Sequence, residues 1–465
     1  MNRREFIGAC AFAAAAVQTH AAQVHVEINV DKTLGRIPAD FTGLGYEISS
    51  VVTPGLLSSE NRVYVELVRG LGAHGVIRVG GNTSDYASFD PAGRSRSAPK
   101  GTVVNEANLR ELATFLNATG WNLIWGLNLG GGTQQEAVAE AQAVAGAAKD
   151  KLLAFEIGNE PDLFGRGAAH RPSSYGYDDY LKEYRSYKAA IRAQLPASQF
   201  AGPDAAGATD WVTRFAHDEA PDLKLLTHHY YRECAGPSST IDKLLHPDPK
   251  LQPQLAQLKK ASDSSGVPCR ICEVNSFCGG GKPGVSDTFA AALWALDYML
   301  KLAWAGASGI NLETGVNQLG FISSYSPLGD DEHGSYSATP EYYGMLAFAQ
   351  IGPGVKLDAA YIDGNLTVYP VAHDDDQLAV VIVNKDESMD AAVTINANRQ
   401  FQDGHVLRLG AQSLAAKQGI TLGNSSVSSD GAWKSGQIPE FKTQDREATV
   451  RVPAASAAIV KLLTA

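Results

Sequence analysis

The sequence predicts an α/β protein, a (β/α)8 TIM barrel with a C-terminal antiparallel β-sandwich that the N-terminal strand joins. Three observations predict this fold. Short apolar runs alternate with longer helical patterns for about 300 residues, which is typical of parallel strands joined by helical crossovers. After about residue 352 apolar and polar residues alternate between turn residues, as in a sandwich. Finally, Val24, Val26, Ile28 and Val30 alternate with polar residues before the barrel begins.

Eight strand candidates make up the predicted barrel. They cover residues 41–49, 75–81, 122–129, 152–158, 200–204, 223–229, 268–274 and 309–314. Helical stretches between them include residues 62–71, 106–119, 135–148, 180–194 and 288–305. The last stretch is apolar almost all round, which we expect of a helix that packs on both the sheet and its neighbours.

The sandwich strands are predicted by alternation. They cover residues 366–371, 378–383, 391–395, 406–409, 448–452 and 457–462. We therefore expect four regions: an export signal at 1–22, the N-terminal sandwich strand at 23–35, the catalytic barrel at 36–350 and the sandwich at 351–465. The sandwich would then be discontinuous in sequence and fixed rigidly to the barrel.

Composition limits the class of protein. The 465-residue chain has a net charge of −11, whereas nucleic-acid and membrane-surface proteins normally show a basic stripe. We expect neither partner. An acidic surface is also a poor long-range match for a heavily sulfated polyanion, although a local basic groove would still allow one.

The N-terminus predicts export. Arg3, Arg4 and Phe6 precede a short apolar run at 9–17 and a small-residue cleavage region at 19–22. The arginine pair resembles a twin-arginine signal, and the alternative is a general secretory signal with a short basic segment. No other apolar run is long enough to span a bilayer, so we expect a periplasmic or secreted protein.

Four cysteines follow the predicted signal. Cys269 and Cys272 lie three residues apart in one predicted strand, so their side chains face opposite sides and a bond between them would strain the geometry. Cys234 and Cys278 each follow a strand, and either a disulfide between neighbouring loops or two free thiols fits their positions. A lone Cys-x-x-Cys is weak evidence for zinc, and we expect no metal ion or cofactor.

Two glutamates end predicted strands of the barrel. Glu160 ends the run Phe-Glu-Ile-Gly-Asn-Glu-Pro at 155–161, and Glu273 ends a second run 113 residues later. Active sites of these barrels lie at the C-terminal ends of the strands, so we expect both carboxyl groups at the mouth. A Glu before Pro is also a common turn residue, but the pair is what retaining glycoside hydrolysis requires, with Asn159 placed to hold the sugar 2-hydroxyl.

Longer segments resemble a known family. Residues 273–282 read Glu-Val-Asn-Ser-Phe-Cys-Gly-Gly-Gly-Lys and continue through Ser-Asp-Thr-Phe-Ala-Ala at 286–291. Arg-Val-Gly-Gly at 78–81 leads to Phe-Asp-Pro at 89–91, and Thr-His-His-Tyr-Tyr stands at 227–231. With Asn-Glu-Pro at 159–161, these segments resemble glycoside hydrolase family 79 of clan A, the heparanase and β-glucuronidase family.

The resemblance implies roles for individual residues. Glu160 would be the acid/base and Glu273 the nucleophile, about 5 to 5.5 Å apart. Gly279 and Gly280 would present N–H groups to the uronate carboxylate, with Lys282 adding a charge. Cys278 stands where many members have a tyrosine that touches that carboxylate. The resemblance also implies that Tyr325 supplies a hydroxyl to the sugar, and that Glu47, Asn82 and Tyr230 meet sugar hydroxyls or the nucleophile.

The implied substrate is an oligo- or polysaccharide with β-linked glucuronic acid, cleaved with retention of configuration. Exo and endo cleavage both fit. The alternatives are another clan A retaining glycosidase, such as a xylosidase or arabinofuranosidase, and a catalytically silent glycan-binding protein. The former has no need for a Gly-Gly-Gly-Lys segment, and the latter has no need for both glutamates.

Several side chains keep two interpretations. Arg78 either lies under the nucleophile or forms an ion pair inside the barrel, and His229 is expected to support the site from behind. Arg166, His170 and Arg171 either meet an anionic leaving group or belong to a solvated loop. Four tryptophans fit the core between barrel and helices better than a sugar platform: Trp121, Trp125, Trp294 and Trp304.

Overall fold

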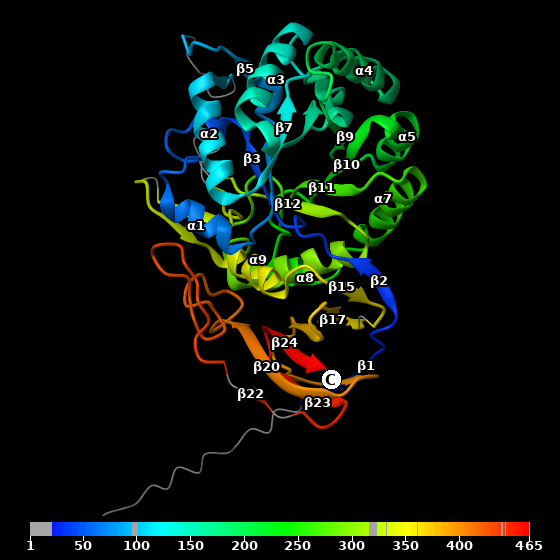
Figure 1. Cartoon of the computed structure of the whole chain (residues 1–465), viewed down its shortest axis with the longest axis vertical. Coiled ribbons are helices and arrows are strands. Elements are labelled where there is room, and N and C mark those ends of the chain that lie inside the picture. The colour runs from blue at the N-terminus through cyan, green and yellow to red at the C-terminus, as the bar shows by residue number, and fades with distance from the viewer. Residues whose placement is uncertain are drawn as a thin grey trace, which may run out of the picture.

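Eight parallel strands close into a barrel in the computed structural model (Figure 1). Around the barrel they are β3 (Gly43–Glu47), β4 (Val76–Gly80), β7 (Asn122–Leu127), β8 (Leu152–Ile157), β9 (Phe200–Ala205), β10 (Leu223–Tyr230), β11 (Cys269–Val274) and β12 (Gly309–Glu313). Each overlaps one predicted strand, and β12 pairs with β3 to close the ring. The predicted fold class is confirmed.

The structure describes residues 21–94, 101–315, 323–331, 333–359, 361–438, 440–441 and 443–464. Residues 1–20 of the predicted export signal lie outside these ranges. Within the described ranges, none of the helices has the length and apolar character that a membrane crossing requires.

Helices connect the strands and surround the barrel. They are α1 (Arg62–Gly70), α2 (Glu106–Thr119), α3 (Gln134–Ala148), α4 (Tyr177–Gln194), α5 (Thr209–Glu219), α6 (Ile241–Leu245), α7 (Leu251–Ser265), α8 (Phe289–Trp304) and α9 (Pro340–Ile351). Side chains of Asn105 and Thr133 begin α2 and α3 with capping boxes, in which the residue three positions later bonds back to the cap.

The barrel interior changes from apolar to polar along the strands. One residue from each of six strands forms a small apolar layer: Val76, Ile124, Ala154, Ala201, Leu225 and Cys272. Because alternate residues of a strand face the same side, the residues two positions beyond Val76 and Ala154 also point inward. These are Arg78 and Glu156, both fully buried, and they begin the polar layer under the mouth.

The sandwich has two sheets. One contains β2 (Thr33–Arg36), β15 (Val355–Leu357), β16 (Tyr361–Asp363), β17 (Leu366–Ala372), β18 (Gln377–Asn384), β20 (Phe401–Gly410), β21 (Thr421–Leu422), β22 (Glu440–Phe441) and β24 (Ser456–Thr464). The other contains β1 (Ala22–Ile28), β19 (Ala391–Ala397) and β23 (Glu447–Val452). The N-terminal strand joins the sandwich as predicted, but β1 pairs with β19 in parallel, whereas the prediction was antiparallel throughout.

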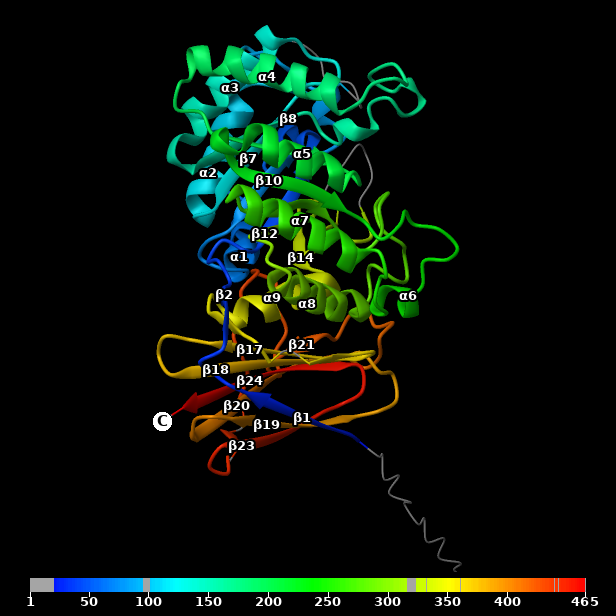
Figure 2. The ribbon, with the colours of Figure 1, turned by 90° about the vertical axis from the view of Figure 1, so that its right-hand side faces the viewer.

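Two short strand pairs complete the strands: β5 (Ser88–Phe89) and β6 (Val103–Val104) are parallel, and β13 (Leu328–Asp330) and β14 (Tyr336–Ala338) are antiparallel. Helices α8 and α9 lie between the barrel and the sandwich (Figure 2). The first amides of α8 donate to the carbonyls of Ala416 and Leu414 on the sandwich. Because these amides have no partner within the helix, the sandwich completes the start of α8.

Candidate active site

The two predicted catalytic glutamates meet at the barrel mouth. Glu160 directly precedes the short 3-10 helix Pro161–Leu163 after β8, and Glu273 is the penultimate residue of β11. A carboxylate oxygen of each, together with a ring nitrogen of His229, lie within 4.8 Å of one another. This close approach suits double displacement, in which the two carboxyl groups stand about 5 to 5.5 Å apart.

Glu160 is held in an unusual backbone conformation. Its φ is 49° and its ψ is 49°, and Asp204 at the end of the next strand has φ 60°. The Glu160 N–H donates to the Asp204 carbonyl at 3.0 Å. Left-handed conformations are costly for non-glycine residues and concentrate at functional sites. The strain lies at the point where the proposed acid leaves its strand.

Arg78 lies beneath the pair and donates to four oxygen-bearing side chains. Its guanidinium donates to Glu273 Oε2 at 3.0 Å and to Glu156 Oε2 at 3.0 Å. The same group donates to Asp204 Oδ2 at 2.5 Å and to Asn159 Oδ1 at 2.8 Å. Burial opposes its charge, but the three carboxylates outweigh burial and raise the pKa of Arg78 well above its ordinary value. Both interpretations of Arg78 therefore hold, because it ion-pairs inside the barrel and also touches Glu273.

His229 links the two glutamates from below. Its Nδ1 is 3.1 Å from Glu160 Oε1 and 3.7 Å from Glu273 Oε2, and its Nε2 is 2.7 Å from Asp204 Oδ1. Burial favours the neutral ring, but the charges of Asp204 and Glu273 prevail and raise the pKa of His229 well above its usual value. A protonated ring is a donor at both nitrogens, which matches carboxylates on both sides.

Two further glutamates lie close to Glu273. Glu47 at the end of β3 accepts hydrogen bonds from the N–H groups of Asn82 and Thr83 at 3.1 and 2.7 Å. Burial and the charge of Glu273 raise the pKa of Glu47 to about 7. Burial and the charges of Glu273 and Glu47 likewise raise the pKa of Glu313, at the end of β12, well above its usual value. Burial thus shifts both carboxyl groups toward the neutral form.

Glycine allows Glu47 to approach. Gly81 has φ +70°, and a Cβ built there would lie 2.4 Å from the carboxyl carbon of Glu47. A side chain at position 81 would thus displace Glu47 from the mouth.

A cavity of about 870 Å³ opens above these residues. Its walls include all four mouth glutamates, Glu47, Glu160, Glu273 and Glu313, and also Asn82. The loop after β8 contributes Asp162, Leu163 and Arg166, and the segment after β9 contributes Ala206, Gly207, Ala208 and Trp211. The remaining wall consists of Tyr231, Glu233, Cys234, Cys278, Gly279, Gly280 and Tyr325.

The predicted site for the uronate carboxylate, the cradle, consists of Gly279 and Gly280 with Cys278 and Tyr325. All four residues line this cavity. The Gly280 carbonyl accepts from Ser324 N–H at 2.7 Å, which holds the loop after β11 against the segment that carries Tyr325. Among the residues that the structure describes, none accepts a hydrogen bond from the N–H of Gly279 or Gly280. These two amides are therefore available to an anionic ligand.

A disulfide forms part of the wall. Cys234 and Cys278 are bonded, which answers the question that their positions in the sequence left open. Backbone bonds add to the link, since Cys278 N–H donates to the Glu233 carbonyl and Ala235 N–H to the Cys278 carbonyl, each at 3.0 Å. The loops after β10 and β11 are thus joined next to the cradle. Cys269 and Cys272 are buried free thiols.

Lys282 is half-buried and does not belong to the wall of the cavity. Its N–H donates to Ser286 Oγ at 2.9 Å, and its carbonyl accepts from the N–H groups of Val285 and Ser286. These bonds turn the chain into α8 directly after the cradle. Contact of its ammonium group with a ligand stays a prediction.

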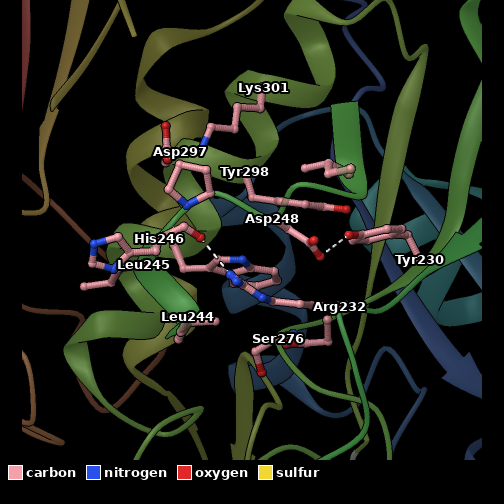
Figure 3. Close-up of a pocket in the computed structure, with 14 residues that line it drawn as sticks. Tyr230, Arg232, Leu244, Leu245, His246, Asp248, Ser276, Asp297, Tyr298 and Lys301 are labelled. Atoms are coloured by element: carbon pink, nitrogen blue, oxygen red, sulfur yellow. Dashed lines mark hydrogen bonds and ion pairs between the residues drawn. The ribbon is translucent and has the colours of Figure 1, made fainter. Parts of the chain in front are cut away.

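The predicted sugar contact of Tyr230 is wrong. Its hydroxyl donates to Asp248, and its ring lies 6.3 Å from that of Tyr298 on α8. Figure 3 shows Tyr230 pointing to Asp248 in a separate small cavity of about 40 Å³. Side chains alternate along β10, so His229 and Tyr231 face the mouth and Tyr230 faces the helices. Tyr231 takes the expected role, because its hydroxyl donates to Glu273 Oε1 at 3.2 Å.

Asn159 is anchored on two sides. Its side-chain oxygen accepts from Arg78, and its N–H donates to Asp85 Oδ2 at 3.0 Å. It lines a second cavity of about 350 Å³, which Asn82, Glu160 and Leu163 share with the first. Its contact with a sugar hydroxyl stays a prediction.

The residues for which the sequence allowed two interpretations lie in the loop after β8 and in the core. Arg171 pairs with Glu183 at 3.1 Å and belongs to the loop's own structure, whereas His170 packs on Phe164 and also lines the second cavity. Arg166 is exposed and reaches the cavity. Of the four tryptophans expected in the core, Trp121 and Trp125 are fully buried, and Trp294 and Trp304 pack against the core.

Sequence reasoning missed five polar or aromatic residues that line the cavity: Asp162, Trp211, Tyr231, Glu233 and Glu313. Tyr231 and Glu313 carried a signal, because the alternation of β10 and the end of the eighth predicted strand both point to the mouth. Trp211 lies inside α5, and nothing in its local sequence separates it from a core tryptophan.

Two groups of possible metal ligands occur among the described residues. Glu160, His229 and Glu273 form one, and Glu156, Asp204 and Cys272 form the other. Arg78 donates to at least one carboxylate of each group. Burial raises the pKa of the Cys272 thiol well above its usual value, which disfavours the thiolate that a metal needs. The donor sets suit an ion-pair network around Arg78.

Fold and site together define a class of protein: a TIM barrel whose mouth holds two carboxyl groups at the spacing of retaining glycoside hydrolases. No family model matches the chain. The chain is 28% identical over 319 residues to a β-glucuronidase of Aspergillus niger. The aligned region covers 61% of this chain and 58% of the relative. It is 27% identical over 372 residues to a β-glucuronidase of Neurospora crassa, covering 70% and 66%.

A heparanase of Bos taurus is 25% identical over 400 residues, covering 73% of this chain and 68% of the heparanase. The chain thus spans about three fifths to two thirds of the length of these relatives. A solved 4-O-α-L-rhamnosyl-β-D-glucuronidase from Fusarium oxysporum superposes with a TM-score of 0.79 at 20% identity, covering 94% of this chain and 100% of that one. An arabinofuranosidase from Xanthomonas axonopodis gives 0.69 at 17% identity, covering 95% and 99%. The resemblance to the heparanase and β-glucuronidase family is confirmed.

Proposed function

We propose that the protein is a retaining glycoside hydrolase that cleaves β-linked glucuronic acid from oligo- or polysaccharides. One observation carries this proposal: carboxylate oxygens of Glu160 and Glu273 lie within 4.8 Å of each other beside the large cavity. Glu273 attacks the anomeric carbon while Glu160 protonates the leaving oxygen. Water then hydrolyses the glycosyl-enzyme with Glu160 as the base.

The surrounding residues support this division of roles. Arg78 Nη1 at 3.0 Å and the Tyr231 hydroxyl at 3.2 Å contact opposite oxygens of Glu273, and both contacts favour a fixed, anionic nucleophile. Glu160 contacts His229 and borders the cavity, where a leaving group has access to its proton. His229 contacts both glutamates, so it is suited to orient Glu160 as the charge of Glu273 disappears and returns.

Preference for a uronic acid is supported by the cradle. The N–H groups of Gly279 and Gly280 border the cavity and are available to an anion, and Tyr325 adds a hydroxyl. The relatives from Aspergillus niger and Neurospora crassa are β-glucuronidases, so the same sugar is the natural choice for this chain.

We further propose that the protein acts in the periplasm or outside the cell. Arg3, Arg4 and the apolar run after them support export, and the Cys234–Cys278 disulfide suits an oxidising compartment. N-terminal sequencing of the protein recovered from each cell fraction tests this, and an uncleaved cytoplasmic protein would contradict it.

The activity is tested by hydrolysis of p-nitrophenyl β-glucuronide and of the matching β-glucoside, β-xyloside and α-arabinofuranoside. We expect a strong preference for the glucuronide, retention of configuration in the first product, and loss of turnover in Glu273→Gln. Preference for the xyloside or arabinofuranoside would replace the proposed substrate and keep the mechanism. Binding of glucuronides without turnover would identify a silent glycan-binding protein.

A further inference from the structure

One side of the cavity is suited to the leaving group. The leaving oxygen must lie next to Glu160, because that residue protonates it. The loop after β8 and the segment after β9 form the wall on the Glu160 side, through Leu163, Arg166 and Trp211. The cradle lies on the other side, after β11. A sugar that places its carboxylate in the cradle therefore directs its leaving group toward Trp211.

Trp211 is a preorganised flat surface. Its ring stacks on Tyr180 with centroids 5.6 Å apart and an interplanar angle of 28°, and the Tyr177 ring lies at 82° to it with centroids also 5.6 Å apart. The indole is half-buried, so one part packs against α4 while another borders the cavity. Rigid aromatic surfaces bind flat apolar faces with little loss of conformational freedom.

The segment in front of Trp211 is also held in place. Asp162 accepts hydrogen bonds from the N–H groups of Ala206, Gly207 and Ala208 at 2.8, 3.2 and 3.2 Å. One carboxylate thus fixes the chain that leads from β9 into α5. The side chains that this segment adds to the wall are small and apolar, which leaves the indole accessible.

The leaving-group wall offers little positive charge to an anionic leaving group. Arg166 is the one cationic side chain among the described residues that line the cavity, and Asp162 on the same wall is acidic. Lys243 neutralises Glu233 at 2.5 Å but does not line the cavity. A sulfated sugar would bring further negative charge next to the acid Glu160.

We propose that Trp211 selects an uncharged leaving group, either an aromatic aglycone or a neutral sugar, which lays its flat apolar face on the indole. This specificity rests on the proposed glucuronidase function. It separates the chain from an enzyme for sulfated polymers, because the wall that receives the leaving group offers stacking in place of a cationic surface.

The test compares substrates with and without an aglycone. β-Glucuronyl fluoride occupies the sugar site alone, whereas p-nitrophenyl β-glucuronide also needs the leaving-group wall. In Trp211→Ala we expect kcat/KM for the p-nitrophenyl substrate to fall about tenfold, the scale of one aromatic contact, with little change for the fluoride. Trp211→Phe should recover most of the loss. Trp433→Ala, which removes a half-buried indole from the sandwich, serves as the matched control.

A second experiment compares substrates whose leaving-group sugar is neutral with substrates whose leaving-group sugar is sulfated. We expect glucuronic acid β-linked to an uncharged hexosamine to be cleaved at least about tenfold faster than the same disaccharide with a sulfate on the hexosamine. An Arg166→Ala variant that keeps this preference agrees with the proposal.

The outcomes distinguish a failure of the proposed glucuronidase function from a failure of the role proposed for Trp211. If neither the fluoride nor the p-nitrophenyl glucuronide is hydrolysed, the proposed function fails. If both are hydrolysed but Trp211→Ala slows both equally, or neither, the leaving group does not use Trp211. A preference for the sulfated disaccharide would also overturn the proposal.

Discussion

Glu273 is held from two directions by residues of different kinds. Arg78 donates to Oε2 from inside the barrel and Tyr231 donates to Oε1 from the cavity wall, so the carboxylate cannot rotate without losing one bond. Arg78 cannot give up its proton, which keeps one positive charge beside the nucleophile throughout the reaction. The Tyr231 hydroxyl can adapt to a change in the charge of Glu273, because it can accept a hydrogen bond as well as donate one.

Removal of the Tyr231 hydroxyl should therefore reduce catalysis. In Tyr231→Phe we expect kcat/KM on the p-nitrophenyl glucuronide to fall about ten- to a hundredfold, the scale of one hydrogen bond to a charged group. Tyr230→Phe is the matched control, since it removes a neighbouring hydroxyl that bonds to Asp248 away from the cavity. Steady-state kinetics with both variants decide the matter, and an equal loss in the two would reject the role of Tyr231.

Tyr230 and Tyr231 show which part of the site was not predicted from the sequence. Strand ends could be predicted because apolar runs are local, and that placed Glu160 and Glu273 at the mouth. The choice between Tyr230 and Tyr231 depended on the pleat of β10, whose register shifts between His228 and His229. Trp211 was beyond sequence reasoning, because only the packing of α4 and α5 shows which part of its ring stays accessible.

Among the elements, the loops after β10 and β11 form one unit. A disulfide between Cys234 and Cys278 and two flanking backbone bonds join them. Cys278 precedes Gly279 and Gly280, so the link fixes the start of the cradle. The barrel strands position the glutamates, and in the proposed function the joined loops position the carboxylate of the sugar. The proposal thus assigns catalysis and specificity to different elements.

Breaking this link should reduce specificity more than catalysis. In the double variant Cys234→Ser/Cys278→Ser we expect KM for the glucuronide to rise with kcat nearly unchanged. The preference over the glucoside should fall by about tenfold, the scale of one charge-assisted hydrogen bond. A reductant should act on the wild type in the same way and leave the double variant unaffected. Unchanged KM in the reduced wild type, with free thiols counted to prove reduction, would contradict this role.

At the scale of the whole molecule, a buried ion pair fastens the barrel to the sandwich. Asp297 on α8 contacts Lys385 beside β18 at 2.6 Å and Lys301 on its own helix at 2.7 Å. Thr367 and Tyr369 of β17 donate to its other oxygen at 2.8 and 3.1 Å. Burial disfavours the charge of Asp297, but the two lysines outweigh burial and hold its pKa well below the usual range.

Asp297 should therefore stabilise the molecule in a pH-dependent way. A carboxyl group whose pKa is lowered by folding stabilises the folded state above its unfolded pKa of about 4, and this contribution is lost as the pH falls through the folded pKa. In Asp297→Asn, Lys385 stays buried without its charged partner, which costs about 3 to 5 kcal/mol at pH 7. The difference from the wild type should shrink as the pH falls below about 4.

Denaturant unfolding at pH 7 and at about pH 2, between the unfolded and folded pKa values of Asp297, measures this difference. Asp374→Asn is the control, because Asp374 pairs with Arg36 on the exposed surface of the sandwich, where solvent screens the pair and little stability depends on it. If Asp297→Asn costs the same at both pH values, its charge does not fasten the two parts, and the loss arises from packing alone. If the cost falls with pH, an ion pair under α8 keeps the sandwich attached to the helix that follows the cradle.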